Sequence, residues 1–174
     1  MHLVLLILAL FVGGEASAKV FYTQQEAMAL AFPDADRIES RTHILSESEV
    51  SIIQSISRSQ VSTRLVTIHK GWRGDDLLGY AHIDVHTVRT KPEGFMVVLR
   101  PDGVVRAVRV LAFHEPLEYM PARRWYARFI GKTRSDGIRV GRDVDAVTGA
   151  TLTTRAAADG VRRMLAYYEV LLGD

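Results

Sequence analysis

The 174-residue chain contains no cysteine, and this absence excludes several classes of redox protein. Without thiolates the chain cannot ligate an iron–sulfur cluster, attach haem through a Cys-x-x-Cys-His segment, or form a disulfide. It also lacks the cysteine that carries the lipid of a lipoprotein. Any redox role must therefore use an organic cofactor or a metal bound by other side chains.

Other catalytic signatures are also missing. The glycines form neither a Walker loop nor a dinucleotide fingerprint. There is no zinc signature and no Ser/His/Asp arrangement. We therefore predict no catalytic residues and no metal ligands. Whether the chain has an enzymatic activity stays open, and the sequence favours a protein that is not a stand-alone catalyst.

An apolar run at residues 3–12 opens the chain and is shorter than the roughly 18 residues of a transmembrane helix. It is followed by Ala-Ser-Ala at 16–18, the small-residue pattern of a signal-peptidase site. We predict residues 1–18 as a signal peptide cleaved before Lys19, a periplasmic location, and a mature form that does not span the membrane. The n-region has His2 but no Lys or Arg, so either the signal is weak or the true start lies upstream.

The net charge of the chain is small. Lys and Arg number 22 against 20 Asp and Glu, and loss of Glu15 with the signal peptide leaves 22 against 19, a net charge of +3. A charge this small and this evenly spread does not indicate a nucleic-acid surface. Basic residues are denser over 123–142, which is either an ordinary solvated surface or an attraction for an acidic redox partner.

Periodicity and capping signals predict a single α+β domain over residues 19–174. Capping boxes at Thr23 and Ser46 predict a helix after each, and Pro-Asp-Gly at 101–103 predicts a hairpin turn. The other expected elements are strands over 37–45, 64–71, 78–88, 95–100 and 104–113, and helices over 121–130 and 152–172. Together they predict an antiparallel meander packed by helices, with a long C-terminal helix.

Three polar residues, His82, Asp84 and His86, alternate along a predicted strand and so share one of its faces. Their types suit a metal ion, but neighbours on one strand face lie roughly 6.5–7 Å apart, which is wide for a single ion. We therefore predict a solvated polar face, with Ile83 and Thr87 on the buried side.

The segment 145–153 reads Asp-Ala-Val-Thr-Gly-Ala-Thr-Leu-Thr and stands directly before the C-terminal helix. Unpaired N–H groups and the positive end of the helix dipole favour a phosphate at such a place. The small residues Gly149 and Ala150 let a bulky group approach the backbone. From the residues alone, this is a phosphate-binding turn or an ordinary helix cap, since threonine is a common N-cap.

The segment resembles the Asp-x-x-Ser/Thr-Gly-Ala-Thr signature of the FMN-binding domain family. That family includes the C subunit of the sodium-pumping NADH:quinone reductase and the G subunit of the Rnf electron-transport complex. In it, a flavin transferase uses FAD to join FMN by a phosphodiester to the last threonine of the motif, here Thr151. The resemblance covers roughly residues 79–174, and its specificity lies in residues 145–153.

The resemblance implies roles for the neighbours of Thr151. Asp145 would present the loop to the transferase, or form an Asx-turn. Thr148 and Thr153 would contact the phosphate or stabilise the helix start. The remaining expected cofactor contacts of the motif are Gly149, Ala150 and Leu152.

A second segment, 114–132, resembles the family's segment after its central hairpin, with His-Glu-Pro at 114–116 where Glu-Thr-Pro is commoner. An isoalloxazine needs a flat apolar wall and polar groups at its pyrimidine edge. Trp125 or Tyr119 would supply the wall, and Glu115 or a backbone N–H the edge. The alternative for Trp125 is ordinary core packing.

The function that the resemblance implies is an exported electron carrier with covalent FMN. It would pass electrons between a membrane-bound reductase and a periplasmic acceptor. The alternative is a sensory or scaffolding module that binds FMN without a covalent bond. A third hypothesis is a flavoprotein reductase, which would turn over with NADH alone.

Overall fold

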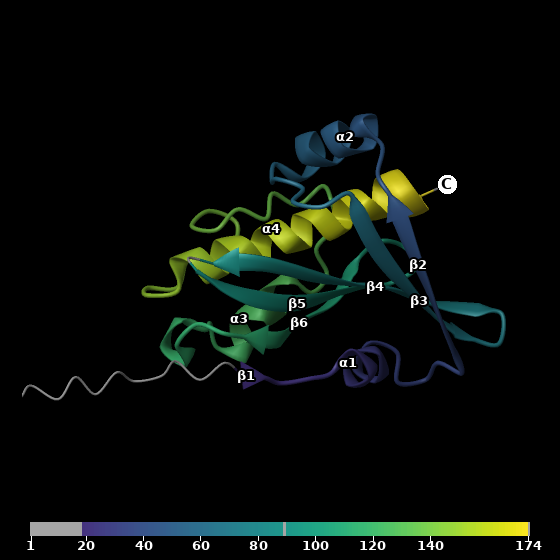
Figure 1. The fold of residues 1–174 in the computed structure, drawn as a ribbon, viewed down its shortest axis with the longest axis horizontal. Coiled ribbons are helices and arrows are strands. Elements are labelled where there is room, and N and C mark those ends of the chain that lie inside the picture. Colours follow the sequence, from purple (N-terminus) through teal and green to yellow (C-terminus); the bar gives the residue numbers. More distant parts are fainter. Residues whose placement is uncertain (1–18, 89, 174) are drawn as a thin grey trace, which may run out of the picture.

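A six-stranded antiparallel sheet forms the centre of the computed structural model, which describes residues 19–88 and 90–173 (Figure 1). The strand order is β1-β6-β5-β4-β3-β2, so β2 to β6 follow one another as a meander and β1 closes the far edge. The strands are β1 (Lys19–Val20), β2 (Arg37–Ile44), β3 (Leu65–Arg73), β4 (Asp76–Val88), β5 (Lys91–Leu99) and β6 (Val105–Phe113). The predicted α+β meander is confirmed, although β1 was not expected.

Helices cover both faces of this sheet. The long helix α4 (Thr151–Tyr167) lies across one face with α2 (Glu47–Ser57) beside it, and α1 (Gln24–Ala31) lies on the opposite face (Figure 1). The remaining helical segments are η1 (Leu117–Tyr119), α3 (Arg123–Tyr126), η2 (Ala127–Phe129) and η3 (Tyr168–Leu172). No helix within 19–88 and 90–173 is long and apolar enough to cross a membrane.

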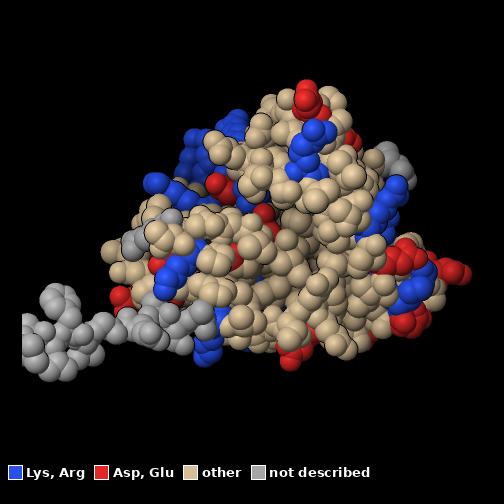
Figure 2. Space-filling view, viewed as in Figure 1, with Lys and Arg blue, Asp and Glu red and all other residues tan. Residues whose placement is uncertain are grey.

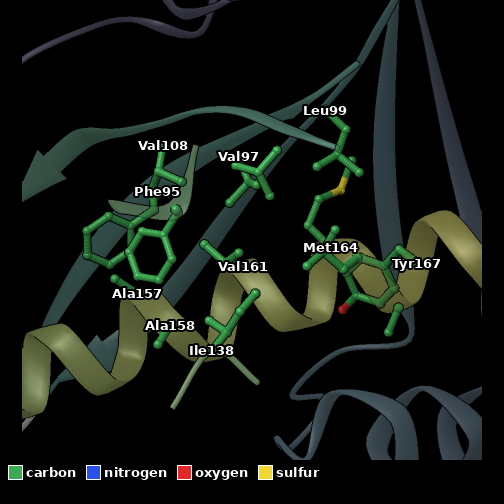
Figure 3. Close-up of a cluster of buried hydrophobic side chains, with 14 of the residues drawn as sticks. Phe95, Val97, Leu99, Val108, Ile138, Ala157, Ala158, Val161, Met164 and Tyr167 are labelled. Atoms are coloured by element: carbon green, nitrogen blue, oxygen red, sulfur yellow. The ribbon is translucent and has the colours of Figure 1, made fainter. Parts of the chain in front are cut away.

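Strand β5 is buried on both faces, because successive side chains point to opposite sides of a sheet. Phe95, Val97 and Leu99 pack in the core beneath α4, where Figure 3 shows them facing Val161 and Met164. The alternate residues of β5 pack instead against α1. This double burial explains the uninterrupted apolar run of the strand.

Both predicted capping boxes are present. The Thr23 side chain accepts from the Glu26 backbone, and the Glu26 carboxylate accepts from the Thr23 N–H at 2.8 Å. Ser46 and Glu49 make the same reciprocal pair at the start of α2. Each box satisfies N–H groups that the first turn leaves unpaired, so these two helix starts were predictable locally.

The helix predicted over 121–130 is shorter than expected, and the prediction was wrong in its extent. Only α3 is α-helical, and the chain then tightens into the 3₁₀ turn η2. Trp125, Tyr126 and Phe129 are all buried, and 3₁₀ geometry stacks residues three apart on one side. It therefore suits the shared burial of Tyr126 and Phe129.

Three of the basic residues over 123–142 have acidic partners. Arg128 pairs with Asp145, Arg134 with Glu169, and Arg139 with Asp143. Figure 2 shows charged side chains of both signs on the face that it views, with uncharged residues covering much of it.

Candidate functional site

The loop before α4 turns sharply and delivers Thr151 to an open helix start. Gly149 has a φ of +83°, a left-handed conformation that favours glycine, and the Ala150 N–H closes the turn on the Val147 carbonyl at 3.0 Å. Ala150 is the N-cap of α4 and has no side-chain cap. Thr151 is thus the first residue of the helix rather than its cap, and its side chain is exposed.

A cavity of about 220 Å³ lies beside Thr151. It is enclosed by three segments far apart in sequence: the end of β4, the segment after β6, and the loop with the first turn of α4. Seven of the predicted contacts line it together with Val88: Glu115, Tyr119, Gly149, Ala150, Thr151, Leu152 and Thr153. The fold therefore brings the two segments singled out in the sequence to one place.

Three predicted contacts lie outside the cavity lining. Trp125 is buried, and its indole Nε1 donates to the Asp145 carbonyl oxygen at 2.7 Å, so it supports the loop from the core side. The Asp145 side chain is 72% exposed and pairs with Arg128. Thr148 is exposed in the turn.

Thr148 and Thr153 were expected either to contact the phosphate or to stabilise the helix start, and neither is the N-cap residue, which is Ala150. Thr153 instead points inward and is 2% exposed. Its hydroxyl donates to Oε1 of Glu93 at 3.1 Å. This bond joins the first turn of α4 to strand β5.

A buried polar chain continues from Glu93 into the sheet. Oε2 of Glu93 lies 3.9 Å from Nε2 of His86, and Nδ1 of His86 bonds Oδ2 of Asp84 at 3.0 Å. Asp84 in turn accepts from Nη2 of Arg163 on α4 at 2.7 Å. Gly160 makes room for this contact, since a Cβ there would lie 2.8 Å from Oδ2 of Asp84.

The solvated face predicted for His82, Asp84 and His86 is therefore wrong. His82 and Asp84 are 8% and 7% exposed, and the opposite-face residue Thr87 is exposed. The physical reason is that Arg163 supplies a buried cation for Asp84, and the Thr67 carbonyl accepts from Nδ1 of His82 at 2.9 Å. Among the described residues, no group of three or more His, Asp or Glu is arranged to hold a metal ion.

The environment shifts the pKa values of the two carboxyl groups in this buried polar chain, Asp84 and Glu93, in opposite directions. Burial raises the pKa of Glu93 to about 7, although the Thr153 hydroxyl lowers it. Burial would also raise the pKa of Asp84, but the His86 hydrogen bond and the Arg163 guanidinium lower it to about 2. Near neutral pH, Asp84 is ionised and Glu93 is half protonated.

Five buried polar side-chain atoms have no hydrogen-bond partner within the described part of the chain, and two of them, Nε of Arg109 and the hydroxyl of Tyr126, belong to residues that do not line this cavity. The other three are Oε1 of Glu115, which lines the cavity, Oε2 of Glu93, which is linked to it through Thr153, and Nε2 of His86 beside Glu93. Buried polar atoms are ordinarily paired, so such a group marks a place for water or a ligand. Together with the N–H groups at the uncapped start of α4, they fit a cofactor that has a phosphate and several polar ring atoms.

Sequence reasoning missed Glu93, Arg163 and Tyr126. The alternation along β5 offers a signal for Glu93, because residues 93, 95, 97 and 99 share one face and the last three are apolar. A glutamate in that row indicates a buried carboxyl that needs a partner. Arg163 carries no such signal, since its partner Asp84 lies 79 residues away.

The chain is similar to two curated proteins over more than half of its length. It is 32% identical to the Regulatory protein NosR of Pseudomonas aeruginosa over 118 residues, which cover 58% of this chain and 16% of the relative. It is 31% identical to NosR of Stutzerimonas stutzeri over 136 residues, covering 68% and 18%. The chain thus spans less than a fifth of the length of these curated relatives.

Among solved structures, the crystal structure of NqrC from Shewanella oneidensis matches with a TM-score of 0.48 and 16% identity, covering 87% of this chain and 76% of that one. The model of the FMN-binding domain family matches residues 91–166, a range that includes β5, β6, the cavity segments and most of α4. Through these residues, less than half of its length, the chain is similar to the FMN-binding domain family.

Proposed function

We propose that the protein is an exported electron carrier in which FMN is joined by a phosphodiester to Thr151. The observation that supports this most directly is the position of Thr151, exposed at an uncapped helix start beside a cavity. Its hydroxyl would attack the pyrophosphate of FAD within a flavin transferase, releasing AMP. Thr151 is therefore an acceptor, and the transferase supplies the catalysis.

The residues around the cavity would hold the bound group. The first N–H groups of α4 would bind the phosphate, Tyr119 would offer an aromatic surface, and Glu115 a polar one. Their neighbours Gly149, Ala150, Leu152 and Thr153 line the same cavity. At about 220 Å³, the cavity is smaller than the roughly 300–1,000 Å³ of sites that enclose a drug-sized ligand, which supports a partly exposed flavin.

Other predicted contacts would act on the loop from outside. Trp125 holds the Asp145 carbonyl, and the exposed Asp145 side chain would face an approaching transferase. Thr148, exposed two residues before the N-cap, would do the same. FMN supplies the redox chemistry when bound, and an exposed flavin suits exchange with a membrane-bound reductase and a periplasmic acceptor.

The decisive experiment is the intact mass of the chain co-expressed with a flavin transferase. We expect a gain equal to FMN minus one water, absent in Thr151→Val and kept in Thr151→Ser, which retains a hydroxyl. Thr87→Val, which removes an exposed hydroxyl on β4, is the matched control and should keep the gain. No gain in any form, with the transferase active on another substrate, would disprove the covalent bond.

The same preparation tests the predicted location and domain extent. Residues 1–18 lie outside the described residues, and we propose them as a signal peptide and residues 19–174 as one FMN-binding domain. Exported protein should begin at Lys19 by N-terminal sequencing. A chain that still carries residues 1–18 after export would contradict the predicted cleavage.

A second candidate is a sensory or scaffolding module that binds FMN without a covalent bond. The match to two proteins named as regulatory favours it. In that case flavin would be released on denaturation, whereas covalent FMN would stay with the chain. Turnover with NADH alone would instead indicate an enzyme, which we do not expect.

A further inference from the structure

The hydrogen positions in the buried polar chain follow from the charge of Asp84. The neighbouring Arg163 guanidinium and the His86 hydrogen bond keep the pKa of Asp84 low despite its burial, so the carboxylate can only accept hydrogen bonds. Nδ1 of His86 must therefore carry the hydrogen that it shares with Asp84 at 3.0 Å. In a neutral imidazole, Nε2 is then an acceptor, and it faces Glu93.

Nε2 of His86 and Oε2 of Glu93 face each other as two acceptors unless one of them carries a proton. They lie 3.9 Å apart, both are buried, and neither has a hydrogen-bond partner among the described residues. A single proton, on the carboxyl or on the imidazole, converts the two acceptors into a donor and an acceptor. Without it, a carboxylate with no exposed surface faces an imidazole lone pair, which is unfavourable.

We propose that Glu93 and His86 form a buried proton-holding pair that gains one proton when the flavin is reduced and releases it when the flavin is oxidised. The proposal rests on the proposed function, because it needs FMN in the cavity that Thr153 lines. Glu93 is linked to that cavity through the Thr153 hydroxyl at 3.1 Å. It acts through its charge and is a positioning residue rather than a catalytic one.

The step balances without any change in the oxidation state of the protein. A redox partner supplies the electrons, solvent supplies the proton, and no covalent bond to Glu93 or His86 forms or breaks. The His86 side chain is 15% exposed while that of Glu93 has no exposed surface, so His86 is the more accessible member of the pair. Negative charge arriving in the cavity raises the proton affinity of the pair, and by reciprocity the proton raises the electron affinity of the flavin.

The surroundings of Glu93 set the pH above which the pair takes up a proton when the flavin is reduced. Burial raises its pKa, the Thr153 hydroxyl and a protonated His86 lower it, and Glu115 raises it, with the balance at about 7. Below this pH the pair already holds its proton in both redox states, so reduction adds no further proton. Above it, the oxidised protein lacks the proton and gains it on reduction. The charged and titratable groups around Glu93 are His86 and Asp84 on β4, Glu115 after β6, Tyr126 on α3 and Arg163 on α4.

The first arm of the test uses flavin-free full-length protein from cells without a flavin transferase. Carbon-13 NMR of the glutamate carboxyls should show one group that titrates near pH 7 rather than near the ordinary value of about 4.3. Glu93→Gln should remove this group, and Glu118→Gln, at an exposed position on η1, should not. Thr153→Val removes a donor that lowers this pKa and should move the titration upward. Absence of any such carboxyl would overturn the proposal.

The second arm measures the flavin midpoint potential against pH in the loaded protein, whether FMN is bound covalently or not. Above about pH 7, wild-type protein should take up one more proton per two electrons than Glu93→Gln, while Glu118→Gln should match wild type. In Thr153→Val the additional uptake should begin at a higher pH, which tests the pair even if Glu93→Gln fails to fold. Equal proton uptake in wild type and Glu93→Gln would overturn the inference and leave the proposed function intact. Failure to bind FMN at all would instead refute the proposed function and the inference with it.

Discussion

The ion pair between Arg163 and Asp84 is a contact whose removal should have a large and measurable cost. Arg163→Met keeps an aliphatic side chain but leaves Asp84, which is 7% exposed, without its cation. It also removes hydrogen bonds to Oγ of Ser59 at 3.3 Å and to the Gln60 carbonyl at 3.4 Å. Breaking a buried pair from one side costs roughly 3–5 kcal/mol. Because 1 kcal/mol corresponds to roughly 2–4 °C in a domain of this size, we expect Tm to fall by roughly 6–20 °C.

The loss should also depend on pH, with a sign fixed by the pKa of Asp84. Burial raises that pKa, but the His86 hydrogen bond and Arg163 lower it from 3.8 to about 2. A lowered folded-state pKa gives stability that is present above the ordinary value and lost as pH falls through the folded value. The difference in unfolding free energy between wild type and Arg163→Met should therefore be largest near neutral pH and shrink as pH falls from about 4 towards 2.

Urea unfolding followed by circular dichroism measures this difference in the flavin-free protein. Removing both charges, with Asp84→Asn and Arg163→Met together, should recover most of the loss, because no buried charge is then left unpaired. Arg155→Met, at an exposed position of the same helix, is the control and should change stability by less than about 0.5 kcal/mol. A double variant as unstable as Arg163→Met, or a difference that does not vary with pH, would refute the reasoning.

Two further predictions concern packing around the site. Gly160→Ala would place a Cβ 2.8 Å from Oδ2 of Asp84, so despite its better helix propensity it should destabilise the protein by roughly 1–2 kcal/mol in urea unfolding. Unchanged or higher stability would show that the carboxyl can move aside. Trp125→Phe removes the indole donor to the Asp145 carbonyl and should cost roughly 1–3 kcal/mol, with faster amide hydrogen exchange over residues 145–150. Exchange at the wild-type rate would mean that Trp125 does not hold the loop.

Much of the fold was predictable because its signals are local. The capping boxes at Thr23 and Ser46 and the Pro-Asp-Gly turn each depend on neighbours within a few residues, and β5 was visible as an apolar run. The site motif at 145–153 was also visible as a segment. The cavity beside it forms where β4, the segment after β6 and α4 come together in the fold. Sequence periodicity does not predict such contacts between distant segments.

The buried polar chain shows the limit of the same reasoning. A strand pattern gives two faces and leaves open which of them is covered. For β4 the polar face looked solvated, because the cation that stabilises Asp84 comes from Arg163 on a distant helix. Glu93 was overlooked for a related reason: its partner Thr153 is 60 residues away in the sequence, where it suggested only a phosphate contact or a stabilised helix start.

The missing side-chain cap at Ala150 affects how easily the helix start that carries Thr151 can unfold locally. The first turn of α4 is held by one tertiary contact, the hydrogen bond from Thr153 to Glu93, and by a local one from the Thr154 hydroxyl to the Thr151 carbonyl at 2.9 Å. A helix end held in this way frays at far lower free energy than global unfolding requires. The attachment of FMN proposed for Thr151 would therefore need only a short segment to unfold locally, while the sheet and the rest of α4 stay folded.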